Sequence, residues 1–184
     1  MPAPLPSLMT PRLVLRPFTA ADGPVVERLA GVREVADTTL NIPHPYPEGA
    51  GAKWIGTHAK AWKAGGGLTL AVALHATPDA LLGAISLVIE REHARGEIGY
   101  WIAAPHWGCG YATEAARAVT TFGFNDLALH RVQGRHFTRN PASGRVMQKL
   151  GMQLEGVHRG AYLRWGVFED VALYGILADE WAAT

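Results

Sequence analysis

Two glycines, Gly108 and Gly110, follow an apolar segment and precede a long segment whose apolar residues recur at helical spacing. The start of a helix presents unpaired backbone N–H groups and the positive end of the helix dipole. Glycine in front of such a helix lets phosphate oxygens approach those N–H groups closely. The pattern is typical of a site for a phosphate-bearing ligand, and it is equally typical of a tight turn that only joins a strand to a helix.

The residues around these glycines argue against two common phosphate-binding motifs. A P-loop requires Lys and then Ser or Thr after its second glycine, whereas Tyr111 follows Gly110. A dinucleotide-binding fingerprint requires a third glycine where Thr113 stands. It also requires an acidic residue about 20 residues further on, where the chain has Ala128 and Leu129. A nicotinamide-dependent enzyme is therefore disfavoured.

Composition and charge narrow the class of protein. The chain has 184 residues, of which 48% are hydrophobic and 18% charged, as is typical of a folded globular protein. The length favours a single domain over residues 1–184, with a loose leader over residues 1–9. There are 17 basic and 16 acidic side chains, so the formal net charge is +1. Because this balance implies no basic face, it argues against nucleic acid as the main partner.

Cys109 is the one cysteine of the sequence. It cannot form an internal disulfide, and no Cys/His pattern typical of a metal site occurs, so we expect a reducing compartment and no bound metal. The N-terminal residues lack the cationic start and apolar core of a signal peptide, and no apolar run is long enough to span a bilayer. These features predict a cytoplasmic protein with no membrane partner.

The periodicity of apolar residues predicts an alternation of strands and helices. The expected strands are residues 12–18, 68–75, 81–90, 97–103 and 131–137, followed by two strands that turn near Trp165 and Gly166. Four helices are expected. The first begins at a capping box formed by Thr19 and Asp22, and the second includes Trp54 and Trp62. The third and fourth cover residues 112–127 and 142–150. A turn is expected at residues 77–79 and a loop over residues 38–51. This order predicts a mixed sheet with helices on its faces.

The stretch EIGYWIAAPHWGCGYATEAARAVTTFGF resembles the acetyl-CoA-binding core of the GNAT superfamily of N-acetyltransferases. The family pattern is R/Q-x-x-G-x-G/A; Gly110 and Ala112 match its two small positions, and Trp107 replaces the Arg or Gln. This replacement is usual in the RimJ/RimL-like branch, which ribosomal-protein N-terminal acetyltransferases share with other enzymes. The segments RLVLRPF, LALHRV and NPASGRVMQKLGMQLEG are also similar to that branch, so the resemblance covers nearly the whole chain.

The resemblance implies an α/β (α+β) fold with a single mixed, largely antiparallel sheet. We expect about six to seven strands flanked by about four helices. In this family the fourth strand, here residues 97–103, splays from the fifth, here residues 131–137, and the pantetheine arm of the cofactor lies between them.

The resemblance further implies transfer of an acetyl group from acetyl-CoA, as cosubstrate, to a primary amine, without a metal. The acceptor partner is either a protein N-terminal α-amine or a small-molecule amine. The alternative from another class is a catalytically inactive module that senses acyl-CoA. Relatives occur as monomers and dimers, so a homodimer is one expected assembly.

The family motifs assign cofactor contacts to three groups of residues. The backbone of the fourth strand would pair with pantetheine through Trp101, Ile102 and Ala103. The loop before the helix would hold the diphosphate through Trp107, Gly108, Cys109, Gly110, Tyr111, Ala112 and Thr113. Asn140 and Ser143 match the family's N-x-x-S motif and would contact pantetheine, although both are also typical of ordinary helix capping.

The resemblance also suggests catalytic and acceptor-binding residues. Glu97 is the first candidate for the base that deprotonates the amine, with a surface carboxylate as the plain alternative, and Glu155 is the second candidate. The Ser143 hydroxyl would donate to the cofactor sulfur. His44 and Tyr46 lie in a loop that the family places over the acceptor, and a plain surface loop is the alternative.

Overall fold

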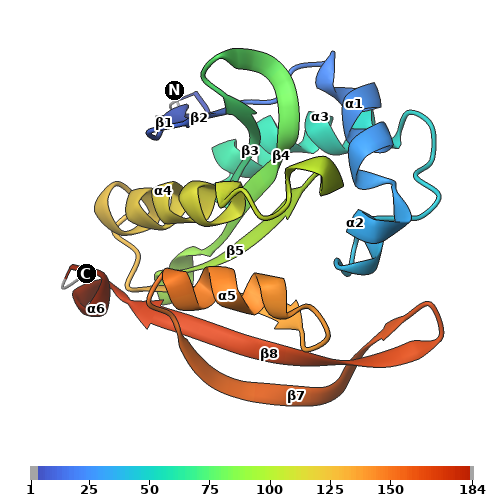
Figure 1. Ribbon diagram of the computed structural model, residues 1–184. Coiled ribbons are helices and arrows are strands. Elements are labelled where there is room, and N and C mark those ends of the chain that lie inside the picture. The colour runs from blue at the N-terminus through green and yellow to red at the C-terminus, as the bar shows by residue number, and fades with distance from the viewer. Residues whose placement is uncertain (1–3, 183–184) are drawn as a thin grey trace.

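The computed structural model describes residues 4–182 and contains one eight-stranded sheet. The strands are β1 (Leu8–Met9), β2 (Leu13–Arg16), β3 (Gly67–Leu74), β4 (Thr77–Glu90), β5 (Arg95–Ile102), β6 (Arg131–Phe137), β7 (Gln153–Arg164) and β8 (Val167–Leu177). Their spatial order is β1-β2-β3-β4-β5-β6-β8-β7 (Figure 1). Neighbouring strands are antiparallel except β5 and β6, which are parallel. The expected mixed, largely antiparallel sheet is therefore confirmed.

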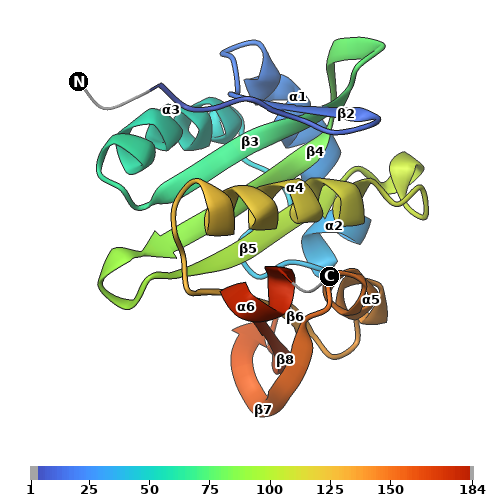
Figure 2. The ribbon, with the colours of Figure 1, turned by 90° about the vertical axis from the view of Figure 1, so that its left-hand side faces the viewer.

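Helices cover both faces of this sheet. They are α1 (Asp22–Ala30), α2 (Arg33–Asp37), α3 (Ala50–Lys63), α4 (Tyr111–Asn125), α5 (Pro141–Lys149) and α6 (Ala178–Ala182), with short 3-10 turns at η1 (Arg91–His93) and η2 (Ala104–His106). Figure 2 shows α4 lying across β4 and β5. No helix among residues 4–182 is long and apolar enough to cross a membrane.

The structure has more elements than the sequence predicts. Eight strands replace the expected six to seven, and six α-helices replace the expected four. Within the expected loose leader, Leu8 and Met9 form a strand that pairs with β2. The additional helices α2 and α6 have five residues each, which is too short for a hydrophobic period to show in the sequence.

The predicted turn at residues 77–79 is wrong. Leu74 pairs directly with Thr77, so the chain reverses at His75 and Ala76, and residues 77–79 begin β4. Pro78 is tolerated in this strand because it lies where the register of the hairpin is irregular. The carbonyl oxygen of Pro78 accepts a hydrogen bond from Arg16 Nε at 2.8 Å.

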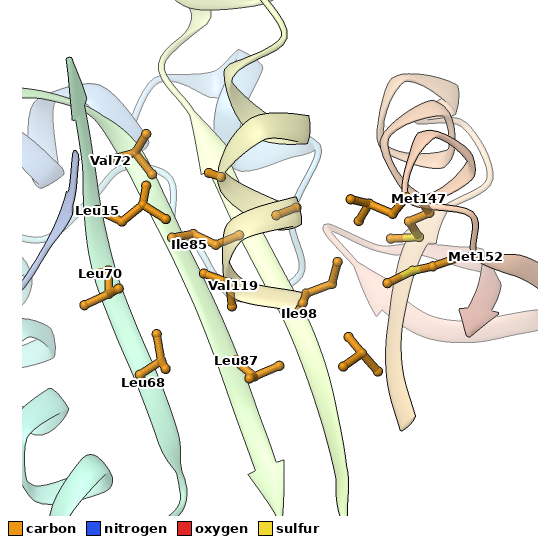
Figure 3. Packing of buried hydrophobic residues seen from close by; sticks show 14 of the residues in the cluster. Leu15, Leu68, Leu70, Val72, Ile85, Leu87, Ile98, Val119, Met147 and Met152 are labelled. Carbon is orange, nitrogen blue, oxygen red and sulfur yellow. The ribbon is translucent and has the colours of Figure 1, made fainter. Parts of the chain in front are cut away.

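Alternating side chains of the strands build two separate hydrophobic clusters, one on each face of the sheet. The first cluster lies under α4 and α5 and includes Leu70, Ile85 and Val119, as the close view in Figure 3 shows. The second cluster lies under α1 and α2 and includes Ala84 and Trp101. Consecutive residues of one strand therefore belong to different clusters, and each face of the sheet can serve a different purpose.

Asp22 fixes the start of α1, although the expected capping box is only half formed, because the N-cap residue is Ala21 and the Thr19 hydroxyl donates to Asp22 instead of accepting from the helix. Its carboxylate accepts hydrogen bonds from the backbone N–H of Thr19 at 2.7 Å and from the Thr19 hydroxyl at 3.0 Å. The guanidinium of Arg16 adds two hydrogen bonds at 2.8 and 2.9 Å. Burial opposes ionisation of Asp22, but the bonds from Arg16 and Thr19 lower its pKa below the ordinary value. This pairing holds α1 against the end of β2.

His58 is a buried histidine on α3 whose two ring nitrogens have no hydrogen-bond partner among the described residues. Its ring packs edge-on against Trp54, with centroids 4.5 Å apart, and lies 5.4 Å from the ring of Phe18. Burial lowers the pKa of His58 from 6.5 to about 4, since the charged form would lose its hydration without gaining a partner.

The depressed pKa of His58 predicts a loss of stability in mild acid. Above pH 6.5 the side chain is neutral in both the folded and the unfolded state, so it makes no pH-dependent contribution. Between pH 6.5 and about 4 the unfolded state binds a proton that the folded state refuses, and the free energy of unfolding falls by up to about 2 kcal/mol. Denaturant unfolding across this range, compared with His58→Leu, measures the effect. Parallel pH profiles of the two proteins would contradict it.

Candidate active site

The parallel strands β5 and β6 pair over only part of their length. Their register joins Arg95 with Arg131 and ends where Ile98 meets Gly134, and β5 continues to Ile102 without a partner on that side. A cavity of about 770 Å³ lies at this divergence, with α4 and α5 on one side of the sheet and residues 38–46 on the other. The expected splay between these two strands is thus present, and it opens into the main cavity found among the described residues.

The alternation of an antiparallel ladder determines which backbone groups of β5 face this cavity. Ala103 donates its N–H to the carbonyl of Leu82 on β4 at 2.8 Å, so Tyr100 and Ile102 direct their backbone groups toward the gap. The Ile102 carbonyl already accepts a hydrogen bond from Trp107 Nε1 at 2.6 Å. Trp101 and Ile102 line the cavity, whereas Ala103 does not. By this alternation the backbone groups of Trp101 and Ala103 both face β4, so the backbone contacts expected from these two residues are unavailable, and only Ile102 of the three faces the gap.

The glycine loop opens onto the same cavity. Gly108 and Gly110 both have left-handed backbone angles, with φ of 78° and 81°, and Gly110 is the N-cap of α4. A Cβ atom added at Gly108 would meet no atom within 4 Å, so glycine is needed there for backbone angle and for open space rather than for packing. Tyr111, Ala112 and Thr113 line the cavity at the unpaired N–H end of α4. This geometry presents backbone donors to a ligand.

Arg12, which lies near the N-terminus of the chain, supports this loop through contacts with Cys109 and Tyr111. Its Nη1 donates to the carbonyl of Cys109 at 3.0 Å, and its guanidinium lies 4.8 Å above the centre of the Tyr111 ring. Its Nε pairs with Glu114 at 2.6 Å, and Thr10 donates to the same carboxylate. Burial opposes ionisation of Glu114, but these bonds lower its pKa below the ordinary value. The sequence gives no signal for this brace, because the partners lie 102 residues apart.

Cys109 contributes through its backbone rather than its thiol. The side chain is exposed, and the residue is not among those that line the cavity. Its carbonyl oxygen is the group that Arg12 holds.

Ser143 lies at the start of α5 and is held by a tyrosine that the sequence analysis missed. Asn140 caps the helix through its side-chain oxygen, which lies 3.4 Å from the Ser143 backbone N–H. The Tyr100 hydroxyl lies 2.7 Å from Ser143 Oγ and also donates to the Ser143 carbonyl at 3.2 Å. Burial raises the pKa of Tyr100 to about 12, although the bond to Ser143 acts in the opposite direction. Tyr100 is therefore protonated at neutral pH, and Asn140 and Ser143 both line the cavity.

Glu97 lies on the other face of β5, because it is an odd number of residues from Tyr100. Its two carboxylate oxygens are held by Arg135 Nε at 2.9 Å and by Gln133 Nε2 at 3.0 Å. Glu97 lines the cavity, as the sequence predicts. Gln133 and Arg135 lie on β6, which runs parallel to β5, and their two bonds fix the direction of the Glu97 carboxylate.

Glu155 is engaged elsewhere. Both of its oxygens accept from the guanidinium of Arg131, and this interaction lowers the pKa of Glu155 despite partial burial. Glu155 is not among the residues that line the cavity. Of the two carboxylates considered as a base, Glu97 alone lies in the cavity.

Residues 38–46, the loop expected over the acceptor, border the cavity, but the two candidate residues of this loop differ in position. Tyr46 lines the cavity and packs against the second hydrophobic cluster. His44 is exposed, does not line the cavity, and has its Nδ1 2.7 Å from the carbonyl oxygen of Gly31. The imidazole thus holds the loop against the end of α1.

Two arginines anchor the ends of the segment that covers this side of the cavity. Arg164, at the tip of the β7–β8 hairpin, donates to the carbonyl oxygens of Ala36 at 2.9 Å and Ile42 at 2.5 Å. Arg139 joins Asp37, with Nη1 2.9 Å from its carboxylate, to the buried Glu169 of β8, with Nε at 2.9 Å. Neither arginine is visible as a functional residue in the sequence, because their partners come from distant segments.

No group of three or more His, Cys, Asp or Glu side chains within residues 4–182 is arranged to hold a metal ion. The cavity instead offers backbone donors on its α4 side, a Ser–Tyr hydroxyl pair at α5 and one carboxylate on the opposite face of β5. This set of groups can orient a phosphate-bearing ligand and move a proton.

Comparison with known proteins identifies the family. Residues 12–153 match the model of the acetyltransferase (GNAT) domain. The chain is 31% identical over 173 residues to YoaA of Bacillus subtilis, named as an uncharacterized N-acetyltransferase, with 94% of this chain and 97% of that protein covered. It is 32% identical over 102 residues to the ribosomal-protein-serine acetyltransferase of Escherichia coli, with 55% and 57% covered. A GNAT-family acetyltransferase from Bacillus anthracis has a TM-score of 0.84 at 25% identity, with 95% and 100% covered.

These matches, together with the divergence of β5 and β6 and the glycine loop before α4, assign the chain to the acetyltransferases. The chain belongs to the GNAT family of acetyltransferases and is an N-acetyltransferase. Its relatives include ribosomal-protein acetyltransferases, so the expected RimJ/RimL-like resemblance is confirmed.

The anchoring by Arg164 predicts a selective defect in acceptor binding. In Arg164→Ala, the carbonyls of Ala36 and Ile42 lose their donor and residues 38–46 lose their fixed position, so KM for an amine acceptor should rise about tenfold, the equivalent of about 1.4 kcal/mol. The affinity for coenzyme A, measured by calorimetry, should stay within about twofold. Arg159→Ala, at an exposed position of the same strand, is the control. An unchanged acceptor KM in Arg164→Ala would remove this role.

Proposed function

We propose that this protein binds acetyl-CoA at the divergence of β5 and β6 and transfers the acetyl group to a primary amine. The observation that carries the proposal is the glycine loop. Gly108 and Gly110 have left-handed backbone angles beside a cavity, at the N-terminus of a long helix; an added Cβ would meet no atom within 4 Å at Gly108 and only Arg12 Nη2, at 3.4 Å, at Gly110. GNAT enzymes use acetyl-CoA, and this arrangement is suited to its diphosphate.

The groups of the cavity fit the remaining parts of the same ligand. The backbone of Tyr100 faces the gap where β6 no longer pairs, so it can bond the amides of a pantetheine chain as an added strand would. Arg145 and Lys149 of α5 also line the cavity and offer positive charge to phosphate groups. Acetyl-CoA would supply an activated thioester carbonyl at this position.

Two side chains on opposite sides of β5, Glu97 and Ser143, would transfer protons. An ammonium has no lone pair, so the acceptor must lose a proton before it attacks, and Glu97 accepts that proton directly or through a water molecule. Ser143 is placed to return a proton to the leaving group, because Tyr100 fixes its hydroxyl and stays protonated at neutral pH. Asn140 holds the helix start from which Ser143 projects.

The acceptor class has support from the relatives in two directions. One relative is named as a ribosomal-protein-serine acetyltransferase, which favours a protein N-terminal α-amine. Another, 34% identical over 89 residues, is named as an FsC-acetyl coenzyme A-N(2)-transacetylase, which favours a small-molecule amine. Thiol release from acetyl-CoA in the presence of a panel of peptides and amines separates the two.

Gly110→Trp tests the cofactor site. The indole would project into the space that the diphosphate needs and would strain the left-handed backbone, so binding of coenzyme A should fall by at least about a hundredfold, or about 2.7 kcal/mol. Isothermal calorimetry measures it.

Gly49→Trp is a matched control for this substitution. Gly49 also has a left-handed angle, with φ of 73°, and also caps the start of a helix, but it does not line the cavity. An added Cβ would meet no atom within 4 Å at Gly49 and only Arg12 Nη2, at 3.4 Å, at Gly110. Its variant should bind coenzyme A normally. Equal affinities of both variants and the wild type would overturn the cofactor site.

Glu97→Gln tests the proton acceptor. Loss of the basic oxygen should lower kcat about a hundredfold at neutral pH while the affinity for coenzyme A is retained. Glu90→Gln, which alters an exposed carboxylate on the neighbouring strand paired with Arg95, should keep normal turnover. Stopped-time assays of thiol release give kcat for each protein. Normal turnover of Glu97→Gln would leave the proton transfer to water, and an inert wild type that binds coenzyme A would indicate an acyl-CoA sensor.

A further inference from the structure

The side of the cavity that faces residues 38–46 is largely apolar, although this segment itself adds the polar side chains of Thr38, Thr39, Asn41 and Tyr46. It is the same side of the sheet as the second hydrophobic cluster, whose members Val26, Val35 and Trp101 reach the cavity. Leu40 and Ile42 add further apolar surface from the covering segment. An acceptor that approaches Glu97 from this face is therefore surrounded by apolar and aromatic side chains.

Two of the polar side chains in this wall are already satisfied. The hydroxyls of Thr38 and Thr39 donate to the carbonyls of Val35 and Ala36, at 2.8 and 3.1 Å, and so cap their own helix. They have no remaining proton to offer a ligand, and their direction is set by α2. Asn41 and Tyr46 are the other polar side chains that residues 38–46 contribute, and the wall around them favours the apolar part of an acceptor.

Negative charge is scarce in the cavity. Among the described residues that line it, Glu97 is the one carboxylate, and both of its oxygens are held by Arg135 and Gln133. Arg135, Arg145 and Lys149 line the same cavity, so its basic side chains outnumber its acidic ones by three to one. The carboxylates of Asp37 and Glu169, close to the rim, are paired with Arg139.

We infer that the acceptor presents its amine on an apolar or aromatic group that carries no second cationic centre. The inference rests on the proposed function and deepens it by naming the substrate class. One ammonium can reach Glu97 and lose its proton there. A second ammonium, as in a polyamine or an aminoglycoside, would be desolvated against the apolar wall, close to Arg135 and with no carboxylate of the cavity free to pair with it.

Two pairs of acceptors that differ in one group test this inference on the wild-type enzyme. The first pair is n-hexylamine and 1,5-diaminopentane, in which a terminal methyl is replaced by an amine. The second pair is one peptide with norleucine or lysine as its first residue. Thiol release gives kcat/KM for each. The apolar member of a reactive pair should be favoured at least about tenfold.

A variant that adds a negative charge tests whether the apolar wall causes the preference for the apolar acceptor. Leu40→Asp adds a carboxylate to the cavity and should reduce the preference for the apolar acceptor at least about tenfold. Leu163→Asp, at an exposed position on β7 that does not line the cavity, is the matched control and should keep the wild-type ratio. The wild-type ratios test the inference independently of whether either variant folds.

The outcomes separate this inference from the proposed function. Thiol release with the diamine or the lysine peptide used as well as its apolar counterpart would overturn the inference and leave the acetyltransferase intact. An unchanged ratio in Leu40→Asp, with normal folding by thermal denaturation, would also overturn it. Absence of thiol release with every amine, while coenzyme A raises Tm, would remove the proposed function and this inference together.

Discussion

The structure depends on what the backbone of β5 does where β6 turns away. A strand in the middle of a sheet has hydrogen-bonding groups on both edges, and buried backbone groups without partners are costly. β5 is paired with β4 along its whole length, but β6 leaves it after Ile98. Trp107 satisfies one of the exposed carbonyls, at Ile102, with its indole N–H. The rest of the open edge is available to a ligand that can act as a strand.

Trp107 explains why the family pattern can lose its Arg or Gln at this position in this chain. An indole has one N–H donor and a large apolar surface, so it can close the end of β5 and still border the cavity. The positive charge near the loop comes from Arg12 instead, which reaches the Cys109 carbonyl from the opposite end of the sequence. The backbone N–H of Trp107 donates to the carbonyl of Ala104, and the loop is thus supported from both sides while no internal hydrogen bond engages the N–H groups of Gly108, Cys109 and Gly110 among the described residues.

On the other side of the cavity, arginine residues likewise hold a loop in place. Arg139 and Arg164 connect segments more than 100 residues apart, and each uses several donors of one planar group. Because these guanidinium groups bond backbone carbonyls as well as carboxylates, they specify the path of the chain and not only its charge. The segment over the acceptor has little regular structure of its own, so its shape depends on these long-range bonds.

Whether a feature of the site could be predicted from the sequence depends on how far apart in the sequence its interacting residues lie. Gly108, Gly110 and Asn140 act on their immediate neighbours, so their roles could be anticipated from local spacing. Tyr100 could have been found from the alternation of β5, which places it on the face of Ile98, although its hydroxyl partner is 43 residues away. Short elements such as α2 leave no periodic signal. The arginine anchors leave none either, because nothing local fixes which carbonyl a guanidinium will meet.

The two faces of β5 therefore place different limits on function. On the α4 side, the cavity offers backbone N–H groups, which every residue type has, so a cofactor site built on them could persist while side chains change. On the α2 side, the cavity is lined by apolar side chains such as Leu40 and Ile42, and Arg164 bonds the carbonyl oxygen of Ile42. A hydrophobic wall discriminates weakly between similar alkyl groups but strongly against an unpaired charge. The acceptor range of such a site is set more by what it excludes than by any one group that it binds.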